Sequence, residues 1–394
     1  MNGLVATMSA AISVGTVVVA CSGGDRVDGP NPYTPANVAS CGASSALFTA
    51  LPIAPANIMG WVPLGALNPP GHTFPTDHQY IYLTTFSSGA APVPLYAPGN
   101  VTVTQARLVH YMPSTGPSTP DDYALDFTPC REVSVDFGHV RTLSPALLSL
   151  LGPFDQQCST YSPNPGLVVS DCYTKRVEIA VNAGDVIGTS AGLDLSLFDS
   201  RVTPLVYANA SRWVSNASGF DHFHVAPFSD YFAEPLRSTV RAMLGSFDGR
   251  TRRTVEPLGG TIATDVAGTA QGVWLNPSQP TYPETPHLAI VPDNVTPSLI
   301  DVSIGASLSG IAPGAYNFAP STTGTVNSDP STITPGSAIY CWEIGYSATD
   351  RRGVVLVQLP DASTLTMEAR SGANRTCASE QPWVFTSAAF TYKR

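Results

Sequence analysis

Short runs of apolar residues, separated by Pro, Gly, Asn and Asp, recur from about residue 51 onward and predict β-strands joined by turns. The spacing of the later runs is typical of a β-sandwich or small barrel. In the first half, strands are expected at residues 79–84, 93–97, 101–110, 123–127, 133–140, 176–181 and 193–198. In the second half, they are expected at residues 288–291, 300–304, 338–343, 354–359, 365–368 and 388–392.

Two segments of the first half carry a helical pattern instead. Ser144 suits the cap of a short helix and Pro145 its first position, and this helix is expected to end at Leu151. Between residues 229 and 244, apolar residues recur at helical spacing, which predicts a longer helix with one face in the core. The residues of that face are Phe232, Leu236, Val240, Met243 and Leu244.

Composition supports a mainly β chain with two folded domains. Only 12% of the residues are charged, whereas 36 are Pro and 33 are Gly, which favours turn-rich β structure over long helices. The composition shifts after Arg253, so we place one domain at residues 51–249 and a second at residues 254–394. The first is expected to be an antiparallel sheet with one or two helices, and the second an all-β barrel or sandwich.

The N-terminus predicts export. Residues 3–20 are almost all small or apolar, and the sequence VVAC that ends at Cys21 resembles a bacterial lipobox, in which the cysteine is lipidated. Residues 1–21 are therefore predicted to be a signal peptide, and residues 22–50 a flexible tether from a membrane-anchored Cys21. Lys and Arg are absent before the apolar stretch, and a signal that is cleaved without lipidation is the alternative. Both interpretations place the protein in the cell envelope or beyond it.

The cysteine count agrees with export. Setting Cys21 aside from the seven cysteines leaves six, and an even number in an exported chain predicts disulfides. We favour the pairs Cys341–Cys377 and Cys158–Cys172, which leaves Cys41–Cys130, although spacing alone leaves other pairings open. The formal net charge is −10 and no basic run is present, so a nucleic-acid partner is excluded.

Several segments in the first half, taken in order, resemble one family. They are PVPLYAPGNVTV at residues 92–103, the paired runs at 123–127 and 133–140, and VNAGDVIGTSAGLDLSLFD at 181–199. Over residues 71–200 they resemble the lysostaphin-type (LytM-type) zinc endopeptidases. The resemblance implies an antiparallel β fold and a tetrahedral zinc. A His and an Asp of an H-x-x-x-D motif, the second His of an H-x-H pair and a water would hold that metal.

The chain departs from this family at the ligand positions. Asp194 and Ser196 stand where the H-x-H pair is expected. The first motif fits either His78, followed by Tyr82 instead of Asp, or His72 with Asp77, which are one residue too far apart. His139, in the sequence FGHV, alone occupies the position of a family histidine, which implies a catalytic role. The peptidase-type zinc site is therefore expected to be incomplete.

Other arrangements of the same side chains stay open. His72, Asp77 and His78, with the carboxylate of Asp194, could hold zinc as a cofactor in a rearranged site. The alternative is a buried hydrogen-bonded network in which Asp77 fixes an imidazole tautomer. A further H-x-H pair, His222 and His224, would face one side if it lay on a strand.

Three other features could indicate a functional site, but a structural role is favoured for each. Ser190 lies in a G-x-S-x-G sequence, yet the segment after it alternates as a strand, whereas a hydrolase nucleophile needs a helix there. His110 and His287 are isolated and expected to be structural. The aromatic residues of the second domain are expected in the core, with a ligand cavity as the alternative. They are Tyr316, Phe318, Tyr340, Trp342 and Trp383.

Three functions follow from these patterns. The leading hypothesis is an exported, lipid-anchored protein whose degenerate peptidase-like domain binds peptidoglycan or another envelope glycan or peptide, or regulates an envelope hydrolase. The first alternative is a metal-dependent hydrolase with a rearranged zinc site. The second alternative is a lipocalin-like carrier of a small ligand, with its site in residues 254–394.

Overall fold

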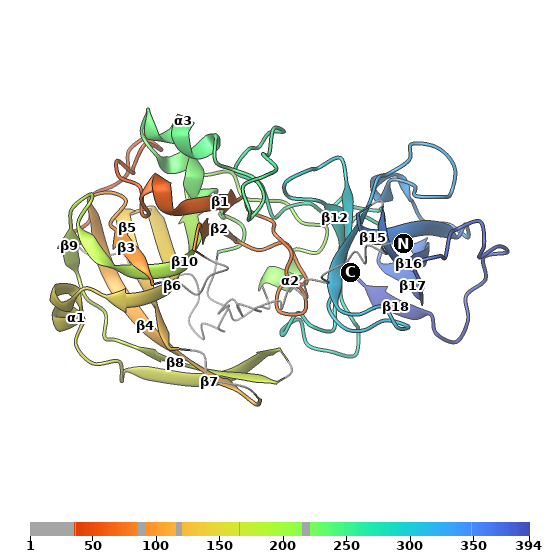
Figure 1. The fold of residues 1–394 in the computed structure, drawn as a ribbon, viewed down its shortest axis with the longest axis horizontal. Helices are drawn as coiled ribbons and strands as arrows, with labels where there is room; N and C mark the ends of the chain where they lie inside the picture. Colours follow the sequence, from red (N-terminus) through yellow and green to blue (C-terminus); the bar gives the residue numbers. More distant parts are fainter. Residues whose placement is uncertain are drawn as a thin grey trace, which may run out of the picture.

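Two antiparallel β-sheets dominate the computed structural model (Figure 1). The structure describes residue 35 and residues 37–85, 91–115, 120–164, 166–214, 221–347 and 349–394. The expected mainly β class with two β domains is confirmed. The predicted signal peptide and its Cys21 lie outside the described residues.

The first sheet has ten strands within the described residues. Its hydrogen-bonded order is β1-β2-β10-β6-β5-β4-β8-β7, while β3 pairs with β10 and β9 with β4. The strands are β1 (Ile58–Val62), β2 (His78–Leu83), β3 (Val93–Tyr96), β4 (Val101–Pro113), β5 (Asp122–Cys130), β6 (Val133–Leu143), β7 (Gln157–Asn164), β8 (Leu167–Tyr173), β9 (Ile179–Val181) and β10 (Val186–Asp199).

Seven of these strands coincide with the runs predicted in the first half, whereas β1, β7 and β8 were not predicted. The sequence of β7, QCSTYSPN, is polar and contains Pro, and that of β1, IMGWV, is short and includes Gly. Neither shows the alternation that marks a strand. β1 forms by pairing with β2, and β7 forms by pairing with β8, which is itself paired with β4.

Alternation along β10 divides the first sheet into two faces. Leu193, Leu195 and Leu197 are fully buried in the hydrophobic core. The residues between them point to the opposite face, where Ser196 pairs with His78 across the neighbouring strand. This opposite face carries the polar residues of interest.

The short predicted helix is confirmed as α1 (Pro145–Leu151), whose cap residue Ser144 accepts a hydrogen bond from the Leu147 amide. The longer predicted helix is wrong. That segment forms a 3-10 helix, η2 (Phe228–Tyr231), and a short helix, α3 (Leu236–Arg241). Pro235 lies between them, and a proline inside a helix removes a backbone donor and clashes with the preceding turn.

The apolar face predicted for that segment nevertheless lies in the core, with Phe232, Val240 and Leu244 fully buried. The remaining helices of the described residues are short. They are η1 (Pro55–Asn57), α2 (Ser211–Val214) and η3 (Pro330–Thr332). No helix among the residues that the structure describes combines the length and apolar character needed to cross a membrane.

The second sheet has eight strands in the described chain, and they follow one another in sequence order. They are β11 (Gly272–Trp274), β12 (Leu288–Pro292), β13 (Ile300–Ile304), β14 (Gly314–Phe318), β15 (Tyr340–Ser347), β16 (Asp350–Asp361), β17 (Thr364–Ser371) and β18 (Phe390–Lys393). Only β11 and β14 were not predicted. Phe318 stacks on Trp342 inside the core of this sheet, and Tyr316 is buried there as well.

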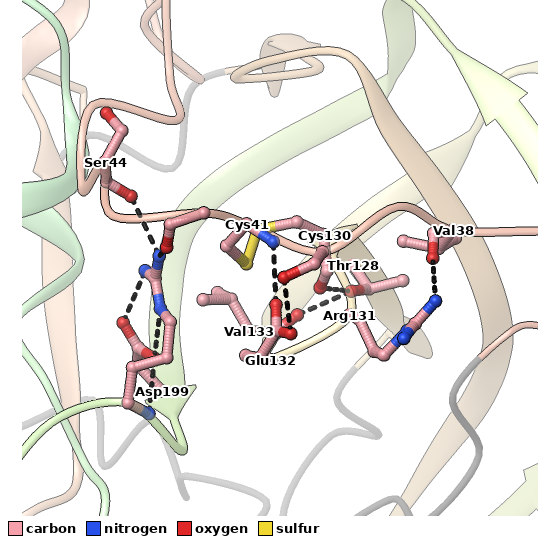
Figure 2. The surroundings of a disulfide bond; sticks show 12 residues. Val38, Cys41, Ser44, Thr128, Cys130, Arg131, Glu132, Val133 and Asp199 are labelled. Atoms are coloured by element: carbon pink, nitrogen blue, oxygen red, sulfur yellow. Dashed lines mark hydrogen bonds and ion pairs between the residues drawn. A yellow bond between two sulfur atoms is a disulfide. The ribbon is translucent and has the colours of Figure 1, made fainter.

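All three predicted disulfides are present: Cys41–Cys130, Cys158–Cys172 and Cys341–Cys377. Figure 2 shows the first of them, where the Glu132 carboxylate accepts a hydrogen bond from the Cys41 amide at 2.7 Å. Three disulfides indicate an oxidising compartment, and hence export.

Residues 41–48 were expected in a flexible tether, but they are docked on the first domain. The disulfide holds Cys41, and the amides of Leu47 and Phe48 both donate to the Tyr231 carbonyl. Phe48 is fully buried and stacks on Phe228. The described residues just before Cys41 are held as well, since Val38 is buried and the Ala39 carbonyl accepts a hydrogen bond from the Arg131 amide.

Candidate functional site

The candidate site residues come together on the face of the first sheet opposite its core. His78 begins β2, His139 lies in β6 and Asp194 lies in β10, and these three strands are adjacent in the order β2-β10-β6. His72 and Asp77 precede β2, and the His72 ring makes an edge contact with the His78 ring. The structure therefore gathers all five residues that the sequence pointed to, although they span more than a hundred positions.

Asp194 lies between two imidazoles. One of its carboxylate oxygens, Oδ2, is 3.3 Å from Nε2 of His139 and 3.7 Å from Nε2 of His78. Burial alone would raise the pKa of Asp194, but the facing His139 and His78 lower it, so the carboxylate is ionised.

His139 faces Asp194 from the adjacent strand β6. Burial alone would lower the pKa of His139, but the carboxylates of Asp194 and Asp122 raise it well above the usual value. The backbone of His139 has φ of 59°, in the left-handed region, where the pairing of β6 with β10 is irregular. This local break turns the imidazole toward the polar face, while the next residue, Val140, stays in the core.

Both imidazoles that flank Asp194 are held from behind by another carboxylate. Nδ1 of His78 is 2.8 Å from Oδ1 of Asp77, and Nδ1 of His139 is 2.8 Å from Oδ2 of Asp122. A carboxylate on one ring nitrogen fixes the orientation of the imidazole and leaves the other nitrogen facing the site.

The pattern extends by one residue at each end. Nε2 of His222 is 3.1 Å from Oδ2 of Asp77, and the Tyr111 hydroxyl donates to Oδ1 of Asp122 at 3.2 Å. Burial would raise the pKa of Asp77, but hydrogen bonds from His222 and His78 lower it. These seven residues form the His/Asp chain, in which histidines and aspartates alternate and a tyrosine follows at one end. Its members, in spatial order, are His222, Asp77, His78, Asp194, His139, Asp122 and Tyr111.

Sequence reasoning missed Asp122 and Tyr111, because nothing local marks either residue as polar-face. Their strands continue the sheet from β6 in the order β6-β5-β4, and the register of that pairing, which decides which side chains meet, is not marked in the sequence. The H-x-H pair lies in a turn and not on a strand, and His224 hydrogen-bonds Asp221 at 2.6 Å, while His222 faces Asp77.

The donor atoms fit a metal only in part. In a tetrahedral zinc site with ligand distances near 2.0–2.1 Å, neighbouring donors are about 3.3 Å apart, and the Asp194–His139 distance matches this spacing. Across the described residues, however, only Cys41, Cys130 and Glu132 place three donor atoms within 4.8 Å of one another. Both of those sulfurs are in a disulfide, so that set is not a metal centre.

The remaining candidates are structural. The Ser190 hydroxyl lies inside β10 and hydrogen-bonds the carbonyls of His139 and Gly192, so it is not a nucleophile on a strand-to-helix turn. His287 accepts from the Asn276 amide and faces the Pro280 carbonyl. Burial lowers the pKa of His287 to about 4, which keeps it neutral.

No family model, no curated protein and no solved structure matches the chain. The lysostaphin-type resemblance consequently remains a prediction from the sequence. A function has to be inferred from the chemistry of the His/Asp chain and from the residues beside it.

Proposed function

We propose that this is an exported, lipid-anchored envelope protein whose first domain binds an envelope glycan or peptide, with peptidoglycan as the first candidate, and does not cleave it. Two neighbouring features of the polar face carry the proposal, namely the His/Asp chain and a row of aromatic rings along β2. The lipid anchor rests on the lipobox-like VVAC sequence, and export rests on the three disulfides.

The aromatic row supports a glycan or peptide ligand. The rings of His78, Tyr80 and Tyr82 follow one another on alternate residues of β2, with centroids 4.7 and 6.1 Å apart. Tyr82 in turn contacts Phe247, whose side chain is 54% exposed. Tyr80 and His78 are buried and Tyr82 is half-buried, so Phe247 is the ring of this row that can stack on the apolar face of a sugar, while adjacent charged groups bind hydroxyls or amides.

The pairing within the His/Asp chain supports binding without cleavage. A peptidase of this type needs a cation that activates water, and its ligating imidazoles must be neutral. Here Oδ2 of Asp194 lies 3.3 Å from Nε2 of His139, so each of these two side chains is the polar partner of the other. Ser196, which takes the place of a histidine in the resembling family, offers no imidazole to complete a zinc site.

A metal-dependent hydrolase is the second candidate, because one observation favours it. The Nε2 atoms of His78 and His139 both face Asp194, while carboxylates hold their Nδ1 atoms. Metal-ligating histidines commonly have this arrangement. With a small movement of one imidazole, His78, His139 and Asp194 would provide two nitrogens and one oxygen for zinc.

Sedimentation with purified peptidoglycan sacculi tests the proposal. We expect the mature protein to pellet with sacculi and to release no soluble fragments, and Phe247→Ala to reduce the bound fraction severalfold. Tyr346→Ala, which removes a 49% exposed ring in the second domain, is the matched control and should bind normally. Fragment release that depends on His78 would favour the hydrolase. Absence of sedimentation by the wild-type protein would refute peptidoglycan binding.

A further inference from the structure

The second domain reaches the His/Asp chain through Glu284, a half-buried acid in the connection between β11 and β12. Its Oε2 atom accepts a hydrogen bond from the Phe74 amide at 2.9 Å, 210 positions away in the sequence. Phe74 lies between His72 and Asp77, so this bond anchors the segment that leads into His78.

Glu284 is also linked to His222, through Arg212 and Trp213. The guanidinium of Arg212 is 3.7 Å from Oε1 of Glu284 and lies over the rings of Phe74 and Trp213, at 3.7 and 3.9 Å. Trp213 in turn stacks on the His222 ring, with centroids 4.0 Å apart. One carboxylate therefore touches both the strand approach to His78 and the stack that holds His222.

The environment of Glu284 shows that these contacts are specific. Burial raises the pKa of Glu284, while the charge of Arg212 opposes that effect. A buried acid is costly unless it is paired and hydrogen-bonded, and here its two oxygens have different partners. The ring of Phe74 also stacks on the ring of His287, so a second residue of the second domain holds Phe74 in place.

We propose that Glu284 is a positioning residue, supplied by the second domain, that keeps the imidazoles of His78 and His222 in contact with the Asp77 carboxylate. The site in the first domain is then complete only when the two domains are docked. This deepens the proposed function, because it concerns the same site, yet it stands on contacts that need no ligand.

Two substitutions separate the effect of the length of the Glu284 side chain from the effect of its charge. Glu284→Gln keeps the length of the side chain and an oxygen that can accept from the Phe74 amide. Glu284→Asp keeps the charge but is one methylene shorter, so it should no longer reach that amide. Asn294→Ala is the control. Asn294 donates a hydrogen bond to the Pro63 carbonyl at 3.0 Å, so this substitution removes a contact between the domains that lies away from the site.

The readout is the imidazole ¹⁵N signals of His78 and His222 in the full mature chain, together with hydrogen exchange at the Phe74 amide. We expect Glu284→Asp to shift both imidazole signals and to speed Phe74 exchange by about tenfold, the effect of losing one hydrogen bond. Glu284→Gln should leave Phe74 exchange within about threefold of wild type, and Asn294→Ala should change neither.

Unchanged imidazole signals in Glu284→Asp would overturn the proposal and leave Glu284 as an ordinary interface residue. The same conclusion would follow if Asn294→Ala shifted the signals equally. Because no ligand is present in this experiment, failure of peptidoglycan binding would not affect its outcome.

Discussion

Asp194 and His139 form a half-buried ion pair on adjacent strands, with Oδ2 3.3 Å from Nε2. Strand register produces this contact, since Asp194 pairs directly with Gly138, the residue before His139. Gly138 has no side chain, and a Cβ at that position would lie only 3.2 Å from the Cβ of Asp194. The chain thus brings a carboxylate to the position at which the resembling family carries an imidazole.

Asp194→Asn should lower the pKa of His139 and change the pH dependence of stability. In the wild type, the raised pKa of His139 stabilises the fold fully below about pH 6.5, and this contribution is lost as pH rises through the folded-state pKa. We expect the variant to lose about 1.5–3 kcal/mol of unfolding free energy at pH 6. Urea unfolding in metal-free buffer between pH 5 and 9 measures this.

The matched control for that experiment is the exposed pair His110–Asp121, which has the same chemistry at the surface. Asp121→Asn should cost less than about 1 kcal/mol, because solvent screens exposed ion pairs. If the two substitutions lowered the unfolding free energy equally, burial would not strengthen the Asp194–His139 pair relative to the exposed one.

Asp77→Asn should flatten the acid side of the stability profile. Hydrogen bonds from His222 and His78 hold the pKa of Asp77 below its usual 3.8. Its stabilising contribution is therefore present above about pH 4 and is lost as pH falls through the folded-state pKa. The unfolding free energy of the variant should fall less steeply below pH 4 than that of the wild type. If the unfolding free energies of the two proteins fell equally steeply below pH 4, Asp77 would not be stabilised by His78 and His222 as described.

The two faces of β10 should respond differently to truncation. Leu195 is fully buried in the core, and Leu195→Ala should cost about 2–5 kcal/mol of unfolding free energy. The neighbouring Ser196 lies on the polar face, and Ser196→Ala should cost less than about 1 kcal/mol. Chemical denaturation of both variants tests the assignment, and a larger cost for Ser196→Ala would reverse it.

The disulfides should differ in their contribution to stability. Cys41–Cys130 closes a separation of 89 residues and Cys158–Cys172 one of 14. Loop-closure entropy predicts that replacing both cysteines of the longer loop by Ala costs about 1.6 kcal/mol more than the same change in the shorter loop. Calorimetry of the two double variants gives the comparison, and an equal or opposite cost would argue against an entropic origin.

The predictability of the fold depended on local pattern. Strands such as β10, with Leu at every second residue, carry their own signal, and so does the Ser-Pro start of α1. By contrast, β7 contains Ser, Thr and Pro, and it becomes a strand only because β8 pairs with it. The predicted long helix failed at Pro235, since its apolar spacing reflects burial in a non-helical segment.

The candidate site was foreseen in part for a similar reason. His78, His139 and Asp194 lie in segments whose order resembles a known family, so their meeting could be expected. Asp122 was not foreseen, because its role depends on strand order. Glu284 was missed as well, since it approaches from the other domain.

Metal content tests the central claim most directly, namely that the His/Asp chain is complete without a catalytic metal. The mature protein should be purified without chelator, and its zinc measured beside that of His78→Ala. We predict far less than one zinc per chain in both proteins. One zinc per chain in the wild type, lost in His78→Ala, would contradict the account and establish a metal centre in its place.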